Sequence, residues 1–233
     1  MKLDVRKKQE AALKKMNESL DSTLFLSYAV KEYCGNIREG RSDVSGLDVT
    51  SAITFTTRTN DELIEYLNDV VSTTYLEQVF QSLFNVFEAS LFDILTIYLK
   101  SNLSLLNPER TITSSTIVDA GNYENVITEL IHNELNKAAY GSVHKWMKQV
   151  SQYLKYQIIS HSDLETLAEM KATRNLLVHA EGICNKIYVE ASSGSARFKL
   201  GERVSIDYGY LIYTHRILCG ILDKVLKAIE SKN

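Results

Sequence analysis

A long apolar stretch in the middle of the chain decides the fold, and at residues 76–98 it reads LEQVFQSLFNVFEASLFDILTIY. Large apolar side chains recur in it every three or four residues, which is the period of an α-helix. They are Leu76, Val79, Phe80, Leu83, Phe84, Phe87, Leu91, Leu95 and Tyr98, with Phe92 and Ile94 on other faces. A helix that is apolar nearly all round belongs in a core. We therefore expect a central helix from about Asp61 to Lys100, interrupted near Ser72–Thr74.

The composition favours helices throughout the chain. Its 233 residues include one Pro and 10 Gly, where average usage would give about 12 and about 16. Both residues weaken or break helices, so a chain with few of them is suited to long helices. The 45% of hydrophobic residues is enough for a sizeable core. We predict an all-α fold, a helical bundle of about six helices with a small β-hairpin before the last helix.

Apolar periodicity and capping residues place the other elements. Further helices are predicted at about Val5–Tyr33, Tyr123–Ala139, Ser142–Tyr156, Asp163–Glu181 and Tyr208–Ile229. The small hairpin, or an ordered loop in its place, is predicted at Lys186–Ile206. Breaks or loops are predicted at Gly35–Gly46, at the Thr-rich Val49–Thr59, which is β-leaning or loop, and at Asn102–Asn122 around Pro108. Asn60 or Asp61 is expected to cap the central helix. Ser162 and Glu165 form a capping-box pattern, and Gly182 suits the left-handed turn after a helix.

The chain is predicted to be a single domain over residues 1–233. No segment rich in Pro, Gly and Ser divides it, and no internal repeat is found. Residues 1–60 would supply an N-terminal helix and the Thr-rich connector, and residues 61–233 would form the core.

Charge, cysteine content and the N-terminus exclude several classes of protein. A formal net charge of −3 and a pI near 6.0 do not fit a protein that coats nucleic acid by charge alone. Residues 42–144 carry −10, flanked by ends of +3 and +4. Cys34, Cys184 and Cys219 lie far apart, which argues against a disulfide framework or a zinc site. The N-terminus lacks the apolar run of a signal peptide, and charged residues interrupt the most apolar helix. We predict a cytoplasmic protein without a membrane partner.

One polar cluster stands out at the end of the helix predicted from Asp163. Residues 169–182 read EMKATRNLLVHAEG, in which Arg174, Asn175 and His179 alternate with apolar residues. Histidine moves a proton near neutral pH, and arginine binds a phosphate and the charge that grows on it, so these residues suit metal-free phosphodiester cleavage. By composition alone, a histidine in this place is ordinarily a helix cap and the arginine a surface ion-pair partner.

The five-residue spacing of Arg174 and His179 hints at a composite site. On an ideal helix this spacing separates two side chains by roughly 140° around the axis. The two residues therefore do not share one face. Either the helix ends between them, or each meets its partner across a subunit interface.

The cluster resembles the defining motif of the HEPN superfamily (higher eukaryotes and prokaryotes nucleotide-binding). That motif is Arg, four to six residues and then His, with a polar residue, often Asn, directly after the Arg. Residues 174–179, RNLLVH, match it, and residues 180–185, AEGICN, are similar to the continuation in defence-associated members. Residues 84–93, FNVFEASLFD, resemble the aromatic, Glu and Asp pattern of the core helix in such proteins. The resemblance covers about residues 60–232.

The resemblance implies a metal-independent RNA endonuclease whose composite active site forms at a homodimer interface, as in defence or toxin effectors. His179 would act as general base or acid on the ribose 2′-hydroxyl or the leaving oxygen, giving a cyclic phosphate. Arg174 would stabilise the charged pentacoordinate state, and Asn175 would orient a partner.

Glu88, Glu181 and Gly182 would support this site. RNA, a second copy, and an antitoxin or regulatory protein are the implied partners; no DNA, membrane, metal or cofactor is expected. Glu181 stands where toxins paired with a nucleotidyltransferase antitoxin carry Tyr, so the resemblance does not extend to a tyrosine-modification switch. Its negative charge also disfavours RNA unless a Lys or Arg offsets it. The alternative is a non-catalytic HEPN-like module that binds a nucleotide or a protein.

The remaining polar and aromatic residues have ordinary structural explanations beside the functional ones. Glu88 is either a buried carboxylate with a hydrogen-bond partner or a contact of Arg174. His215 is expected in the core or an interface, and Cys184 as a small buried hydrophobe. His132, His144 and His161 are expected to be solvated, while Tyr140, Trp146, Tyr153 and Tyr156 either stack on bases or belong to the core.

Overall fold

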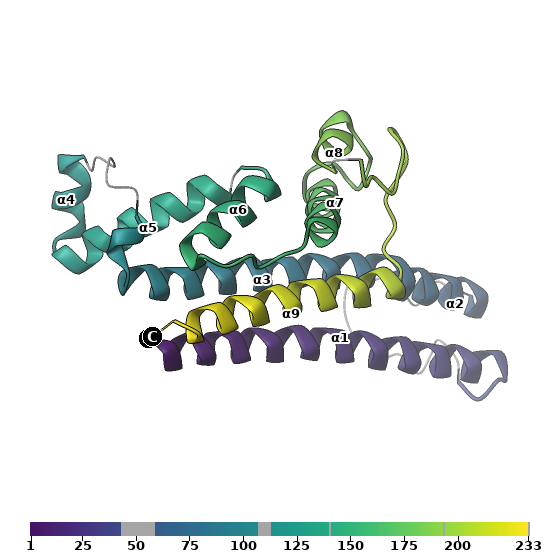
Figure 1. Cartoon of the computed structure of the whole chain (residues 1–233). Helices are drawn as coiled ribbons and strands as arrows, with labels where there is room; N and C mark the ends of the chain where they lie inside the picture. The colour runs from purple at the N-terminus through teal and green to yellow at the C-terminus, as the bar shows by residue number, and fades with distance from the viewer. Residues whose placement is uncertain (43–58, 107–112, 140, 193, 233) are drawn as a thin grey trace.

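The computed structural model describes residues 1–42, 59–106, 113–139, 141–192 and 194–232, which are mostly helical (Figure 1). The helices are α1 (Lys2–Arg38), α2 (Asn60–Asp69), α3 (Tyr75–Lys100), α4 (Ser114–Ala120), α5 (Tyr123–Ala139), α6 (Val143–Leu154), α7 (His161–His179), α8 (Lys186–Ala191) and α9 (Tyr208–Glu230). The predicted all-α fold is confirmed. Within the described residues, the six predicted helices are present, with α2 and α3 forming one of them, and two short helices, α4 and α8, are added.

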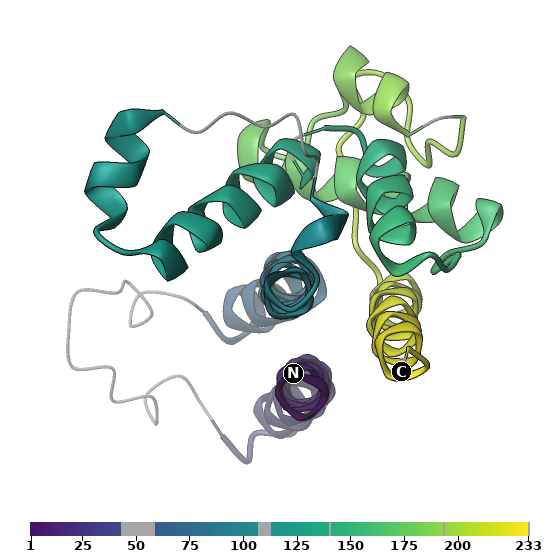
Figure 2. The ribbon, with the colours of Figure 1, turned by 60° about the vertical axis from the view of Figure 1, so that its left-hand side comes forward.

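The central helix is α3, as predicted. α1 and α9 pack on one side of it, and α5 and α7 pack on the other; Figure 2 views α1 and α3 nearly along their axes. The Phe80 ring stacks on Tyr210 of α9 with centroids 5.5 Å apart, and Phe87 meets Trp146 of α6 edge-on at 6.0 Å. Both phenylalanines are fully buried. The aromatic side chains of α3 therefore join the helices of both sides into one core.

The predicted interruption of the central helix is a π-helical turn, Val70–Thr74, which joins α2 to α3. The N–H of Tyr75 donates to the carbonyl of Val70, five residues back, where an α-helix would use the carbonyl four residues back. The helix continues through this turn from α2 into α3, so the interruption is a change of hydrogen bonding and not a break in the helix (Figure 1).

The cap of α2 differs from the prediction. Thr59 lies in an extended conformation, and its hydroxyl accepts from the N–H of Glu62 at 3.3 Å, while the Glu62 carboxylate accepts from the N–H of Thr59 at 2.7 Å. This reciprocal pair is a capping box, because the acid stands three residues after the threonine. Asn60 and Asp61 are therefore inside the helix, and the predicted cap is wrong by one residue.

The helix α1 is longer than predicted and runs through Gly35 to Arg38. Cys34 and Ile37 in its last turns are buried beside Leu63 of α2, and this burial offsets the cost of a glycine inside a helix. The predicted break at Gly35–Gly46 therefore begins later, and its remainder from residue 43 lies outside the described residues, as does the Thr-rich segment up to residue 58.

A short helix replaces part of the loop predicted at Asn102–Asn122. Residues 114–120 form α4, whereas Pro108 lies outside the described residues.

The predicted hairpin at Lys186–Ile206 is wrong. The Asn185 side chain accepts from the N–H of Tyr188 at 2.9 Å and starts α8, and the pairing near it is one antiparallel bridge between Ile183 and Arg203. The alternation of Ile187 and Val189 that suggested a strand leaves both side chains exposed on the helix. Tyr188, between them, is buried, so a single tyrosine anchors this segment.

The continuous helix Asn60–Lys100 is long and apolar enough to cross a membrane by length and composition alone. The core helix of a soluble protein meets the same criterion. In this fold α3 buries Leu83, Leu91 and Leu95 among the other helices, which accounts for its apolar character.

Candidate functional site

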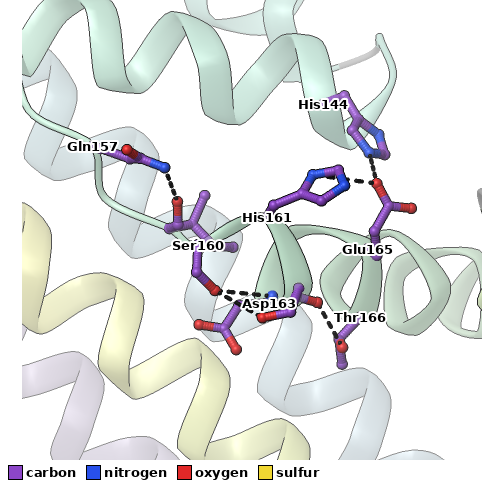
Figure 3. Close-up of polar contacts among 9 residues, drawn as sticks. His144, Gln157, Ser160, His161, Asp163, Glu165 and Thr166 are labelled. Carbon is purple, nitrogen blue, oxygen red and sulfur yellow. Dashed lines mark hydrogen bonds and ion pairs between the residues drawn. The ribbon is translucent and has the colours of Figure 1, made fainter.

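The helix α7 carries the predicted motif, and it begins two residues earlier than predicted. Ser160 is extended, and its hydroxyl accepts from the N–H of Asp163 at 3.1 Å, as the close-up of this region in Figure 3 shows. The predicted capping box is therefore wrong, since Ser162 already lies inside the helix. Glu165, its expected second member, instead bonds to His144 Nε2 of α6 at 2.8 Å.

The end of α7 matches the prediction that His179 lies in its last turn. His179 is the last helical residue, and the N–H groups of Ala180 and Gly182 both donate to the carbonyl of Leu176, at 2.8 and 3.0 Å. Glu181 and Gly182 are left-handed, with φ of 51° and 74°. The left-handed φ of Gly182 favours glycine, and a Cβ there would also lie 3.1 Å from a guanidinium nitrogen at the flexible end of Arg203.

A cavity of about 620 Å³ lies between α3, α5, α6 and α7. Four of the six predicted site residues line it: Glu88, Arg174, Asn175 and His179. The other residues that line it are Ala89, Phe92, Leu95, Leu135, Asn136, Ala139, Gly141, Trp146 and Lys171. Its size lies within the range of small-molecule sites. Glu181 and Gly182 do not line it; they form the turn after α7, and Glu181 is exposed.

The helix continues through both motif residues, yet Arg174 and His179 line the same cavity. The first alternative raised by their spacing, a helix that ends between them, is therefore wrong. Asn175 and His179 are exposed, while Arg174 is half-buried. A contribution from a second subunit stays a prediction.

Near the motif, three cations contact α3, at positions 77, 85 and 88, and they differ in the side chain that each one meets. The pairs are Arg203–Glu77 (2.9 and 3.1 Å), Arg174–Asn85 (2.9 Å) and Lys171–Glu88 (3.2 Å). The outer two cations have a carboxylate partner, whereas the middle one has an amide. Of these three cations, Arg174 is therefore the one whose charge no carboxylate neutralises, and it lines the cavity.

Arg174 makes only neutral hydrogen bonds within the described part of the chain. Its Nη2 donates to Asn85 Oδ1 at 2.9 Å and its Nη1 to Asn175 Oδ1 at 3.2 Å, while its Nε is buried without a hydrogen-bond partner. The Glu88 contact expected for it goes to Lys171 instead. A guanidinium in this state retains its charge and its donors for an anion, and a phosphate accepts such bonds in pairs.

Lys171 is the functional candidate that the motif did not predict. Its Nζ lies 3.2 Å from Glu88 Oε1, donates to the carbonyl of Ala139 at 3.2 Å, and lies 4.6 Å from the Trp146 ring centroid. The sequence could have indicated Lys171 by its position three residues before Arg174, because this spacing puts the two side chains on one helix face.

A buried carboxylate, also missed at the sequence level, connects α7 to α8 and α9. Glu169 accepts from the hydroxyls of Tyr210 at 2.6 Å, Thr173 at 2.7 Å and Tyr188 at 2.9 Å. Burial and the Glu169 charge raise the pKa of both tyrosines, so these hydroxyls stay protonated and keep donating. The network holds the motif helix against the C-terminal elements.

The other candidates have structural surroundings. His144 bonds to Glu165, His132 lies beside the Phe92 ring at 5.0 Å, and His161 is exposed. Burial raises the pKa of the Cys184 thiol, as fits a buried hydrophobe. Tyr153 is buried and donates to Glu134 at 2.5 Å, Tyr156 is exposed, and Trp146 is buried at the cavity wall, whereas Tyr140 lies outside the described residues.

His215 lies between α1 and α9, and it predicts a pH dependence of stability. Its Nε2 bonds to Asn17 at 2.8 Å, and burial lowers its pKa from 6.5, although Asp21 opposes this shift. The unfolded chain therefore binds more protons at this position, so the free energy of unfolding should fall as pH drops below 6.5.

In denaturant titrations at pH 7.5 and pH 5.5, His215→Gln should lose less stability on acidification than the wild-type protein. His161→Gln, at an exposed position, is the control and should keep the wild-type difference. An unchanged pH difference in His215→Gln would show that this histidine does not supply it.

Neither metal-ligating side chains nor similarity to known proteins assigns a function to this site. In the described ranges, no group of three or more His, Cys, Asp and Glu side chains is placed to hold a metal ion. No family model, curated protein or solved structure matches this chain.

Proposed function

We propose that this chain is a metal-independent RNA endonuclease of the HEPN type, with a composite active site formed where two copies meet. The observation that carries the proposal is Arg174, which lines the same cavity as His179 and, among the described residues, bonds only to amide oxygens. A guanidinium and an exposed imidazole in one cavity suit a phosphodiester, because the guanidinium binds the phosphate and the imidazole moves a proton.

The reaction is an internal transfer at phosphorus. The 2′-hydroxyl of the ribose gives its proton to a base and its oxygen bonds to phosphorus, while the bond from phosphorus to the 5′-oxygen breaks and that oxygen takes a proton from an acid. The products are a 2′,3′-cyclic phosphate and a 5′-hydroxyl. Arg174 stabilises the charge that grows on the phosphoryl oxygens, and the Asn175 amide holds the guanidinium in place.

A second copy would complete the proton transfers. The reaction needs a base and an acid at opposite sides of the phosphate, and His179 is the one histidine among the described cavity-lining residues. The partner's His179 would supply the second group. A role as a cytoplasmic defence or toxin effector, restrained by an antitoxin or regulatory protein, belongs to the same proposal.

Asn85→Asp tests the assignment of Arg174 with little change of shape. The new carboxylate would neutralise the guanidinium, so we expect cleavage of an RNA oligonucleotide to fall by about tenfold or more. Thermal stability should stay equal or rise, because the hydrogen bond to Arg174 becomes charge-assisted. Arg174→Ala should lose activity to at least the same extent.

The control is Asn133→Asp, at an exposed position of α5 that does not line the cavity, which adds the same charge and should cleave at the wild-type rate. Full activity in Asn85→Asp would remove Arg174 from the phosphate site.

The second candidate is a non-catalytic HEPN-like module that binds a nucleotide or a protein. The apolar side chains that line the cavity, among them Phe92, Leu135 and Trp146, favour it, since such a surface can hold a small ligand that is not cut. Tight nucleotide binding by a wild-type protein that leaves RNA intact would select this function over cleavage.

A further inference from the structure

We propose that Glu88 is a specificity-determining residue that limits the cavity to ligands placing a single phosphate group in it. The inference rests on the proposed function in taking Arg174 as the phosphate site, and it adds which phosphorylated compounds the site prefers. A phosphodiester of RNA meets this condition. Nucleoside di- and triphosphates gain no affinity for the cavity from their additional phosphates.

The cavity contains two cations, and their spacing alone would favour a longer anion. Lys171 and Arg174 stand three residues apart on α7, so their side chains are neighbours on one face. Both line the cavity. A diphosphate could bridge them if both were free.

Lys171 is not free. Three groups from three different helices hold its ammonium: the Glu88 carboxylate of α3, the Ala139 carbonyl of α5 and the Trp146 ring of α6. The side chains of Lys171 and Glu88 are 15% and 28% exposed, so solvent screens this pair weakly. Moving Lys171 to a second phosphate would leave Glu88 unpaired and would bring the new negative charge beside it.

Arg174 differs because the corresponding position of α3, one turn before Glu88, is Asn85. The amide orients the guanidinium without cancelling its charge. With Asn85 beside Arg174 and Glu88 beside Lys171, the charge of Arg174 remains for a ligand, while the charge of Lys171 is used in an ion pair between helices.

The test measures the affinity ratio of adenosine triphosphate to adenosine monophosphate, in EDTA so that neither carries a metal. Trp146 is the only tryptophan of the chain and lines the cavity, so its fluorescence reports binding there. We expect the wild-type dissociation constants to agree within about threefold. In Glu88→Gln, which frees Lys171, the triphosphate should gain about tenfold over the monophosphate, the effect of one added charge-assisted contact.

Two variants make the result specific. Adding Lys171→Met to Glu88→Gln should restore the wild-type ratio, because the freed cation is gone. Glu129→Gln removes the same charge from an exposed position of α5 that does not line the cavity, and it should leave the ratio unchanged. An equal rise in Glu129→Gln would mean a general charge effect and would overturn the proposal.

The remaining outcomes separate this inference from the proposed function. A wild-type protein that binds the triphosphate ten times more tightly, or a Glu88→Gln protein with an unchanged ratio, overturns the role of Glu88 and leaves RNA cleavage standing. A shifted ratio in a protein that does not cleave RNA supports Glu88 and overturns catalysis. No fluorescence response to either nucleotide in any of these proteins overturns the role of Glu88, whereas the proposed function is judged by RNA cleavage alone.

Discussion

Replacing His179 by alanine should reduce cleavage of an RNA oligonucleotide by about 10²–10⁴-fold, the usual contribution of a general acid or base. The side chain is exposed at the last position of α7, so its removal should change the free energy of unfolding by less than about 1 kcal/mol, mainly through the interaction of an imidazolium with the helix C-terminus. Cleavage in EDTA and the melting temperature are the two measurements.

The matched control is His161→Ala, at the other end of the same helix, where the side chain is 86% exposed. It should retain wild-type cleavage. If His179→Ala cleaves as fast as the wild-type protein, His179 is not the proton-transfer group. A variant that melts early would instead indicate a structural role and favour the non-catalytic module.

Replacing Glu169 by alanine should lower the free energy of unfolding by about 3–5 kcal/mol, a large part of the stability of an ordinary domain. The substitution removes the acceptor of the Tyr188, Tyr210 and Thr173 hydroxyls, and each buried donor left unsatisfied costs about 1–3 kcal/mol. Urea denaturation followed by circular dichroism measures the change.

Glu169→Gln retains one carbonyl oxygen and the shape of the side chain, so it should cost less than the alanine variant. Glu129→Ala, on the exposed side of α5, should change the stability by less than about 0.5 kcal/mol. A loss below about 1 kcal/mol in Glu169→Ala would mean that the network does not hold α8 and α9 to α7.

Elements determined by local spacing could be predicted from the sequence. The apolar periodicity placed α5 at its observed bounds and α9 within one residue, because apolar side chains recur in every turn of a helix that packs on a core. The segment around α8 could not be predicted in this way. Its conformation depends on the Tyr188 hydroxyl reaching Glu169, 19 residues back, and no local pattern of Ile187 and Val189 carries that information.

The same distinction between local spacing and long-range contacts applies to the candidate site. Arg174, Asn175 and His179 stand close together in the sequence, so the motif brought them to attention. Asn85 and Glu88, the partners of Arg174 and Lys171, are more than 80 positions away on α3. Only the packing of α7 against α3 shows which of the two cations is neutralised.

The π-helical turn Val70–Thr74 changes the direction in which side chains point on either side of it in one continuous helix. A residue added to or removed from a helix rotates everything beyond it by about 100°. Through this turn, α2 directs Leu63 and Ile64 toward the end of α1, while α3 keeps its own aromatic face toward the main core. The two ends of a single helix therefore serve separate apolar clusters, and their relative orientation depends on one residue of chain length, independently of side-chain chemistry.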